Sequence, residues 1–167
     1  MGSGKSTHGR KLAKALGVEF IDLDAYIKKK LNKTIPEIFE THGEAFFREQ
    51  ETSCLKEIVE LKKEPCVIAL GGGAICFNDN LKLVKDNGLV IYLETHESVL
   101  RQRLLRSTNQ RPLLKGKSDD EVLQFIKDKI IERKKFYDEA HLKVDGLNLT
   151  TQKLLNEIGS YYNNAIK

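Results

Sequence analysis

The chain has 167 residues, a length that suits one domain with a substantial core, spanning residues 1–167. It is 40% hydrophobic and 31% charged, as ordinary globular proteins are, and its net charge of +4 is too small to indicate nucleic-acid binding. No apolar run approaches the roughly 20 residues of a membrane span. Three cysteines without C-x-x-C spacing indicate free thiols in a reducing compartment. We therefore expect a cytoplasmic protein that binds neither membranes nor nucleic acid.

The first residues carry the most informative motif. The run Gly2-Ser3-Gly4-Lys5-Ser6-Thr7 matches the second half of the phosphate-binding loop G-x-x-x-x-G-K-[ST]. In such a loop, backbone N–H groups and the lysine hold nucleotide phosphates, and the Ser/Thr hydroxyl ligates Mg²⁺. A helix predicted over residues 7–16 would add its partial positive charge. The alternative is a solvated Gly/Ser-rich terminus, but the helix that follows favours nucleotide binding.

The position of this motif is unusual. The first glycine of the full pattern, and the buried strand that normally precedes it, would lie upstream of Met1. We expect the native chain to begin roughly ten residues earlier, with a strand of about 5–6 residues. A native start at Met1 is the alternative.

Strands and helices alternate along the rest of the chain. Strands are predicted at residues 19–24, 66–70, 89–93 and 141–144, and helices at 24–31, 35–41, 44–62, 80–86, 98–105, 119–136 and 152–163. Capping boxes, Thr34 with Glu37 and Ser118 with Glu121, mark two helix starts. The alternation predicts an α/β fold in three α/β/α layers with a central parallel sheet, of five strands once the upstream strand is added.

Ligands of such sheets bind beyond the carboxyl ends of the strands, which makes residues at these ends candidates. Asp22 and Asp24 alternate in an extended segment, so one can serve a metal and phosphates while the other serves a second substrate. Asp24 could also be the N-cap of the helix that follows. The run Gly71-Gly72-Gly73 indicates backbone laid against a ligand.

Three arginines occupy distinctive positions. Arg48 lies in an amphipathic helix, where a surface role is the plain interpretation, and Arg133 lies near a helix end, where it could compensate the helix dipole. Arg111 lies on a polar loop followed by Pro112 and Gly116. This loop, about residues 107–117, fits a lid that closes over phosphates.

Together these motifs resemble the shikimate kinases, P-loop small-molecule kinases. The resemblance rests on motifs that occur in the same order over nearly the whole chain: GSGKST, Asp22-Leu23-Asp24, Gly43-Glu44-x-x-Phe47-Arg48-x-x-Glu51, Gly71-Gly72-Gly73-Ala74, Arg111-Pro112-Leu113 and Arg133-x-x-x-Tyr137. It implies transfer of the γ-phosphoryl group of ATP to the 3-hydroxyl of shikimate, in the aromatic amino-acid pathway.

The resemblance also implies a role for each candidate. Lys5, Asp24 and Arg111 would be catalytic, and Ser6 and Asp22 would hold Mg²⁺. Shikimate would be bound by Asp24, Arg48, Arg133 and the backbone of Gly71, Gly72 and Gly73, with Glu51 orienting Arg48. ATP would be bound by Gly2, Ser3, Gly4, Lys5, Ser6, Thr7 and Arg111, and its adenine by Arg106, or by Arg103 as the alternative.

Two other functions remain open from the residues alone. Another small P-loop kinase, for gluconate or a nucleoside monophosphate, would share the loop and lid but not the grouping of Asp24, Arg48 and Arg133. A nucleotide-binding module without activity is the second. We expect a monomer, because no long apolar face is left over.

Overall fold

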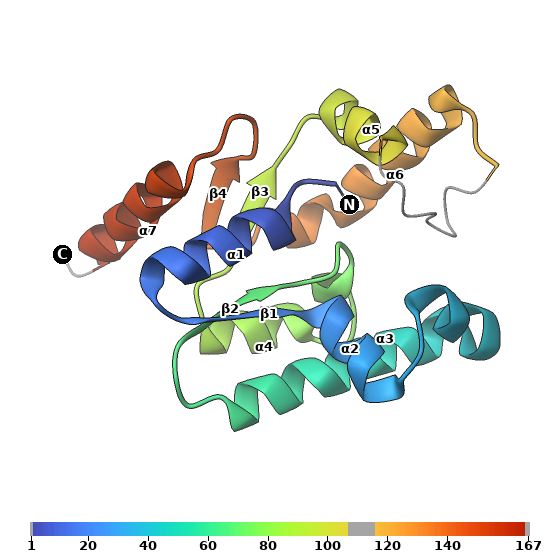
Figure 1. Cartoon of the computed structure of the whole chain (residues 1–167). Coiled ribbons are helices and arrows are strands. Elements are labelled where there is room, and N and C mark those ends of the chain that lie inside the picture. Colours follow the sequence, from blue (N-terminus) through green and yellow to red (C-terminus); the bar gives the residue numbers. More distant parts are fainter. Residues whose placement is uncertain (1, 107–115, 166–167) are drawn as a thin grey trace.

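The computed structural model describes residues 2–106 and 116–165 (Figure 1). Helices and strands alternate along it: α1 (Lys5–Leu16), β1 (Glu19–Asp22), α2 (Leu23–Leu31), α3 (Ile35–Leu61), β2 (Cys66–Ala69), the 3-10 turn η1 (Ala74–Cys76), α4 (Asn80–Asn87), β3 (Ile91–Glu94), α5 (Glu97–Leu105), α6 (Asp119–Tyr137), β4 (Leu142–Asp145) and α7 (Thr151–Ala165). The α/β class and the predicted order of elements are confirmed.

The strands pair in parallel, as predicted. β1 pairs with β2 from Glu19–Cys66 to Asp22–Ala69, and β3 pairs with β4 from Ile91–Leu142 to Glu94–Asp145. Within the described residues β2 and β3 are not hydrogen-bonded, so the expected central sheet is present as two two-stranded sheets. The fifth strand of the prediction concerned residues before Met1, which the sequence does not contain.

Helices cover both faces of the β1–β2 pair (Figure 1). α1 packs on one face, with α3 and α4 on the other, and α7 packs against both α1 and β4. One buried cluster joins β1, α2 and α3 through residues such as Ile21, Ile27 and Ile58. A second joins α1, β3, β4 and α7, and a third holds α5 on α6. These contacts fix the start of α1 beside the carboxyl ends of β1 and β2.

The local signals for helix ends act as the sequence predicted. Both capping boxes form, Thr34 with Glu37 and Ser118 with Glu121. Gly43, at φ 79° and ψ 177°, interrupts α3 between the two helices predicted there. The helix axis therefore changes direction at Gly43, and the part of α3 after this kink contains Glu44, Arg48 and Glu51.

The strand predicted over residues 19–24 ends earlier than expected. The Asp22 side chain accepts a hydrogen bond from the Ala25 N–H at 3.1 Å, which makes Asp22 the N-cap of α2. Asp24 lies in the first turn of that helix, so the suggestion that Asp24 is the N-cap was wrong. The expected alternation of the two aspartates in an extended segment was therefore also wrong, because Asp24 lies in the helix, and both residues line the same cavity.

The three thiols, of Cys54, Cys66 and Cys76, are free, in agreement with the sequence-based interpretation. Within residues 2–106 and 116–165, no helix combines the length and apolar character needed to cross a bilayer.

Candidate active site

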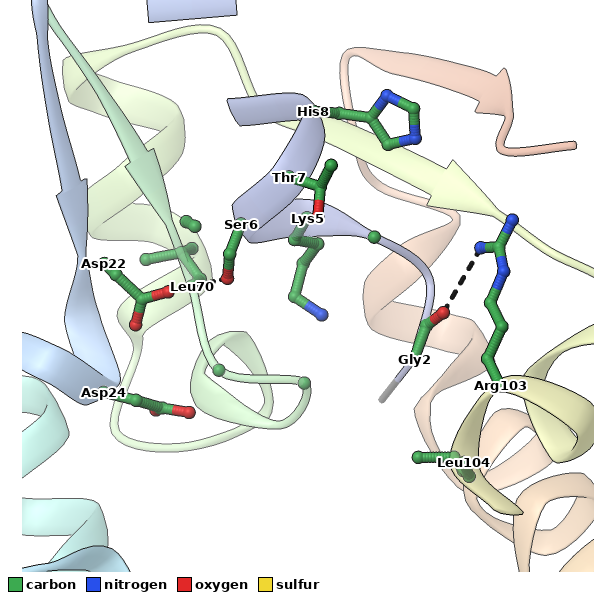
Figure 2. A pocket seen from close by; sticks show the side chains of 14 residues that line it. Gly2, Lys5, Ser6, Thr7, His8, Asp22, Asp24, Leu70, Arg103 and Leu104 are labelled. Atoms are coloured by element: carbon green, nitrogen blue, oxygen red, sulfur yellow. Dashed lines mark hydrogen bonds between the residues drawn. The ribbon is translucent and has the colours of Figure 1, made fainter. Parts of the chain in front are cut away.

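A cavity of about 490 Å³ lies where the start of α1 faces the carboxyl ends of β1 and β2 (Figure 2). It brings together the predicted phosphate loop, both aspartates, and Gly71 and Gly72 of the glycine run, whereas Arg48 and Arg133 are not part of its lining. Its lining consists of Gly2, Gly4, Lys5, Ser6, Thr7, His8, Asp22, Asp24, Ala69, Leu70, Gly71, Gly72, Arg103 and Leu104.

The phosphate loop has backbone geometry that requires glycine. Gly2 and Gly4 have φ of 71° and 91°, in the left-handed region that other L-residues rarely adopt. Gly4 is the N-cap of α1, so the free N–H groups and positive end of the helix dipole face the cavity. Figure 2 shows the Lys5 side chain extending into the same space. A helix N-terminus with an adjacent lysine is an anion site suited to phosphates.

Ser6 and Asp22 form a small group of oxygen atoms at one side of the cavity. The Ser6 hydroxyl donates to Asp22 Oδ2 at 2.6 Å, while Oδ1 is the helix cap. Within the described residues there is no cluster of three or more His, Cys, Asp or Glu side chains placed to hold a metal ion. A hydroxyl and a carboxylate suit Mg²⁺, which keeps several waters and takes its remaining ligands from phosphates.

The Gly71–Gly73 turn passes against charged side chains. A Cβ at Gly71 would lie 2.6 Å from Glu51 Oε1 and 3.2 Å from Asp24 Oδ1. A Cβ at Gly73 would lie 3.2 Å from Arg133 Nη2 and 3.3 Å from Arg48 Nη2. A side chain at Gly71 would therefore collide with the Glu51 carboxylate, and one at Gly73 would press on both guanidinium groups, which face the same point of the turn.

Arg48 is held by two carboxylates of its own helix. Its Nη1 donates to Glu51 Oε2 at 2.5 Å, and its Nε and Nη2 donate to Glu44 Oε1 at 3.1 and 2.8 Å. The Glu51 side chain is 1% exposed and that of Arg48 11%. Burial raises the pKa of Glu51, the nearby Asp24 adds to this, and the Arg48 guanidinium acts against it. The predicted contact between Glu51 and Arg48 is confirmed.

Arg133 reaches the turn from α6. It is buried, and its Nη1 donates to the Gly72 carbonyl oxygen at 2.8 Å. The Tyr137 hydroxyl donates to the same oxygen at 2.5 Å. The sequence placed Arg133 among the candidates, but it gave Tyr137 no role beyond membership of a motif.

The two arginines considered for adenine differ in position. Arg103 lines the cavity, and its Nη1 donates to the Gly2 carbonyl oxygen at 3.3 Å (Figure 2). Arg106 is the exposed C-cap of α5 and is not part of the cavity lining. Arg111 and most of the predicted lid, residues 107–115, lie outside the described residues.

Sequence reasoning missed His8, which also lines the cavity. Its ring lies 3.0 Å from the position that a Cβ on Gly4 would take. Burial lowers the pKa of His8, and the cationic side chains of Lys11 and Arg103 lower it further. Its place in the first turn of α1, directly after Thr7, was the available signal.

Comparisons with known proteins agree with one another. The family model described as shikimate kinase matches residues 1–162. A shikimate kinase of Bacteroides thetaiotaomicron is 45% identical over 140 residues, 84% of this chain and 79% of that protein. The crystal structure of shikimate kinase from that organism has a TM-score of 0.84 at 40% identity, covering 99% of this chain and 91% of the other. Shikimate kinase from Acinetobacter baumannii in complex with shikimate has a TM-score of 0.81 at 36% identity, covering 100% and 90%.

Proposed function

Because this chain belongs to the shikimate kinase family, we propose that the cavity between its phosphate loop and its glycine turn is where it phosphorylates shikimate. The activity is ATP-dependent phosphorylation of shikimate, in the shikimate pathway of aromatic amino-acid biosynthesis. One observation carries the assignment of the site. The cavity joins an anion site for ATP to Gly71 and Gly72 of a turn on which the guanidinium groups of Arg48 and Arg133, which do not line the cavity themselves, converge.

We call the ATP side the donor end: Gly2, Ser3, Gly4, Lys5, Ser6, Thr7, Asp22 and Arg103. Backbone N–H groups of the loop and the Lys5 ammonium would hold the β- and γ-phosphates. For adenine the geometry favours Arg103 over Arg106, because only Arg103 lines the cavity. The role of Arg111, as a lid cation on the transferred phosphoryl group, rests on the family motif alone.

We call the shikimate side the acceptor end: Asp24, Arg48, Glu51, Gly71, Gly72, Gly73 and Arg133. Two rigid guanidinium forks suit a carboxylate, and that is the one anionic group of shikimate. Glu51 is the buried counter-charge that keeps these cations in place before substrate arrives. The backbone of the turn, without side chains, lets the shikimate ring approach closely.

In the transfer, the 3-hydroxyl oxygen of shikimate attacks the γ-phosphorus, and the bond from that phosphorus to the β,γ-bridging oxygen breaks. Asp24 would take the hydroxyl proton, since its carboxylate lies beside the glycine turn and within the cavity. Positioning and charge stabilisation supply most of such a reaction's catalysis. Lys5 and the start of α1, which also line the cavity, would supply the charge stabilisation.

Members of this family need a divalent metal, and we propose Mg²⁺, held by Ser6 directly and by Asp22 through water. Their two oxygen atoms, 2.6 Å apart at the donor end, support this choice. When bound, the ion neutralises phosphate charge.

We further propose one catalytic domain over residues 1–167, acting as a monomer in the cytoplasm. Free thiols support a reducing compartment. The large exposed apolar side chains belong to different elements, among them Leu16, Leu61, Ile131 and Tyr162, which supports a monomer. Light scattering after size exclusion, at several protein concentrations, tests the oligomeric state.

The proposed function is tested with a coupled assay that follows ADP release with shikimate, gluconate or AMP as acceptor. Shikimate alone should support turnover, and Lys5→Ala should abolish most of it. Lys14→Ala is the matched control, because Lys14 is exposed on the same helix. Turnover of gluconate or AMP at a rate equal to that of shikimate, or full activity of Lys5→Ala, would contradict the assignment.

A further inference from the structure

Tyr137 touches the acceptor end without any role in the proposed reaction. It is the last residue of α6, one helical turn beyond Arg133, so both side chains extend from the same face of the helix. The Tyr137 hydroxyl and Arg133 Nη1 donate to one carbonyl oxygen, that of Gly72, at 2.5 and 2.8 Å. Two donors use both lone pairs of this oxygen and thereby fix the orientation of its peptide group.

That peptide group joins Gly72 to Gly73, so its orientation affects the turn on both sides of Gly72. Gly73, which supplies the N–H of this peptide group, faces Arg133 and Arg48, and Gly71, on the other side of Gly72, faces Asp24 and Glu51. A rotation of the peptide would therefore move the turn relative to the carboxylate and guanidinium groups that we assign to shikimate. It would also remove the acceptor that holds the Arg133 guanidinium.

The Tyr137 ring is itself fixed. It stacks on Tyr92 of β3, with ring centroids 4.6 Å apart and planes 13° from parallel. Burial raises the pKa of Tyr137, and that of Tyr92 to about 12, so both phenols keep their protons at neutral pH. Tyr137 is therefore a permanent donor on a rigid ring, anchored to the sheet.

We propose that Tyr137 is a positioning residue of the acceptor end, orienting Arg133 and the glycine turn for shikimate through the shared Gly72 carbonyl. This inference rests on the proposed function and adds to it a residue that touches neither substrate. It differs from a purely structural role, because the hydrogen bond of Tyr137 falls on the Gly72 carbonyl oxygen at the acceptor end, next to the donor from Arg133. Loss of the hydroxyl should affect shikimate and leave ATP alone.

Tyr137→Phe tests this, because it keeps the ring and its stacking and removes only the donor. We expect KM for shikimate to rise about 3- to 10-fold, the range for one lost neutral hydrogen bond. KM for ATP and the melting temperature should change little. Tyr162→Phe, on the exposed face of α7, is the matched control and should change nothing. An unchanged KM for shikimate, or equal rises in both KM values, would overturn the proposal.

A double-mutant cycle sharpens the test. If Tyr137 acts through Arg133, the effect of Tyr137→Phe should shrink when Arg133 is already alanine. Fully additive effects would overturn the coupling. Calorimetric titration of shikimate into wild type and Tyr137→Phe measures the same difference without turnover. Its result stands even if the wild type fails to phosphorylate shikimate, an outcome that would defeat the proposed function instead.

Discussion

The donor and acceptor ends of the cavity are built in different ways. At the donor end the phosphate site consists of backbone N–H groups, Lys5, and an exposed hydrogen bond between Ser6 and Asp22. At the acceptor end the charges are desolvated, with Glu51 1% and Arg133 9% exposed. The acceptor end is thus assembled by internal ion pairs before substrate binds. The donor end binds its ligand mainly through backbone N–H groups and the Lys5 side chain at a more open surface.

This difference has a physical reason. A triphosphate carries several charges and a metal, so an open site with backbone donors can bind it strongly. A small carboxylate carries one charge, and a fully hydrated pair of cations would hold it weakly. Partial burial of Arg48 and burial of Arg133 near Glu51 strengthen each interaction with the substrate and reduce the reorganisation that binding requires.

The largest effect is expected from removing the buried counter-charge. Glu51→Ala should lower the free energy of unfolding by about 3 kcal/mol, since breaking a buried ion pair costs about 3–5 kcal/mol. We expect the lower end, because Arg48 keeps its contact with Glu44. Chemical denaturation measures this. Glu49→Ala, exposed on the same helix, is the control. A stability equal to wild type would mean that the acceptor end is not held by this pair.

The next effect separates the two ends directly. Arg48→Ala and Arg133→Ala should each weaken shikimate binding roughly 10- to 100-fold, which corresponds to about 1.5–3 kcal/mol for a hydrogen bond to a charged group. ATP binding should stay close to wild type. Arg48→Lys should also bind shikimate poorly, because an ammonium cannot replace a bidentate fork. Titrations with each substrate decide this, with the exposed Arg10→Ala as control. Unchanged shikimate affinity in both alanine variants would place the carboxylate elsewhere.

Much of this arrangement could be predicted from the sequence, because short motifs fix local geometry. The GSGKST run predicted the loop, and two capping boxes predicted where two helices begin. Short motifs do not, however, determine the direction in which each side chain points. Asp22 became a helix cap because its carboxylate reached the Ala25 N–H, which shortened the strand by two residues relative to the prediction.

The rest depends on contacts between segments far apart in the chain. The choice between Arg103 and Arg106 depends on how α5 packs, since only one of them faces Gly2. Tyr137 gains its partner 65 residues away, at Gly72, through the packing of α6 beside the glycine turn. The local sequence does not name either partner: Tyr137 stands in the Arg133-x-x-x-Tyr137 motif, but nothing in that motif points to Gly72.

A smaller effect is expected from the exposed carboxylate at the acceptor end. Glu44 Oε1 accepts hydrogen bonds from Nε and Nη2 of Arg48, the two donors that a substrate carboxylate would use. The Glu44 side chain is 57% exposed. Exposed ion pairs are worth roughly 0.2–1 kcal/mol, so Glu44→Gln should lower KM for shikimate by up to about fivefold. Steady-state kinetics measures this, with Glu40→Gln as control. A higher KM would show that Glu44 holds Arg48 in its productive orientation.

The smallest effect is expected at His8, beside the donor end. It tests whether the positive charges of Lys11 and Arg103 disfavour protonation of this histidine until phosphates bind. The pKa of His8 lies below the ordinary histidine value of 6.5, because of burial first and then Lys11 and Arg103. The unfolded chain therefore binds a proton more readily than the folded one, and stability should fall as the pH drops below about 6.5. His8→Gln should remove this part of the acid sensitivity. Melting curves of the wild type and His8→Gln between pH 8 and 5 measure this loss of acid sensitivity.

The same measurement with ligands compares the two ends. Bound ATP should reduce the difference in acid sensitivity between wild type and His8→Gln, since its phosphates offset the charges of Lys11 and Arg103. Bound shikimate should leave that difference unchanged. If shikimate and ATP changed the acid sensitivity of the wild type equally, the donor and acceptor ends would be electrostatically coupled. That result would contradict the distinction between the two ends.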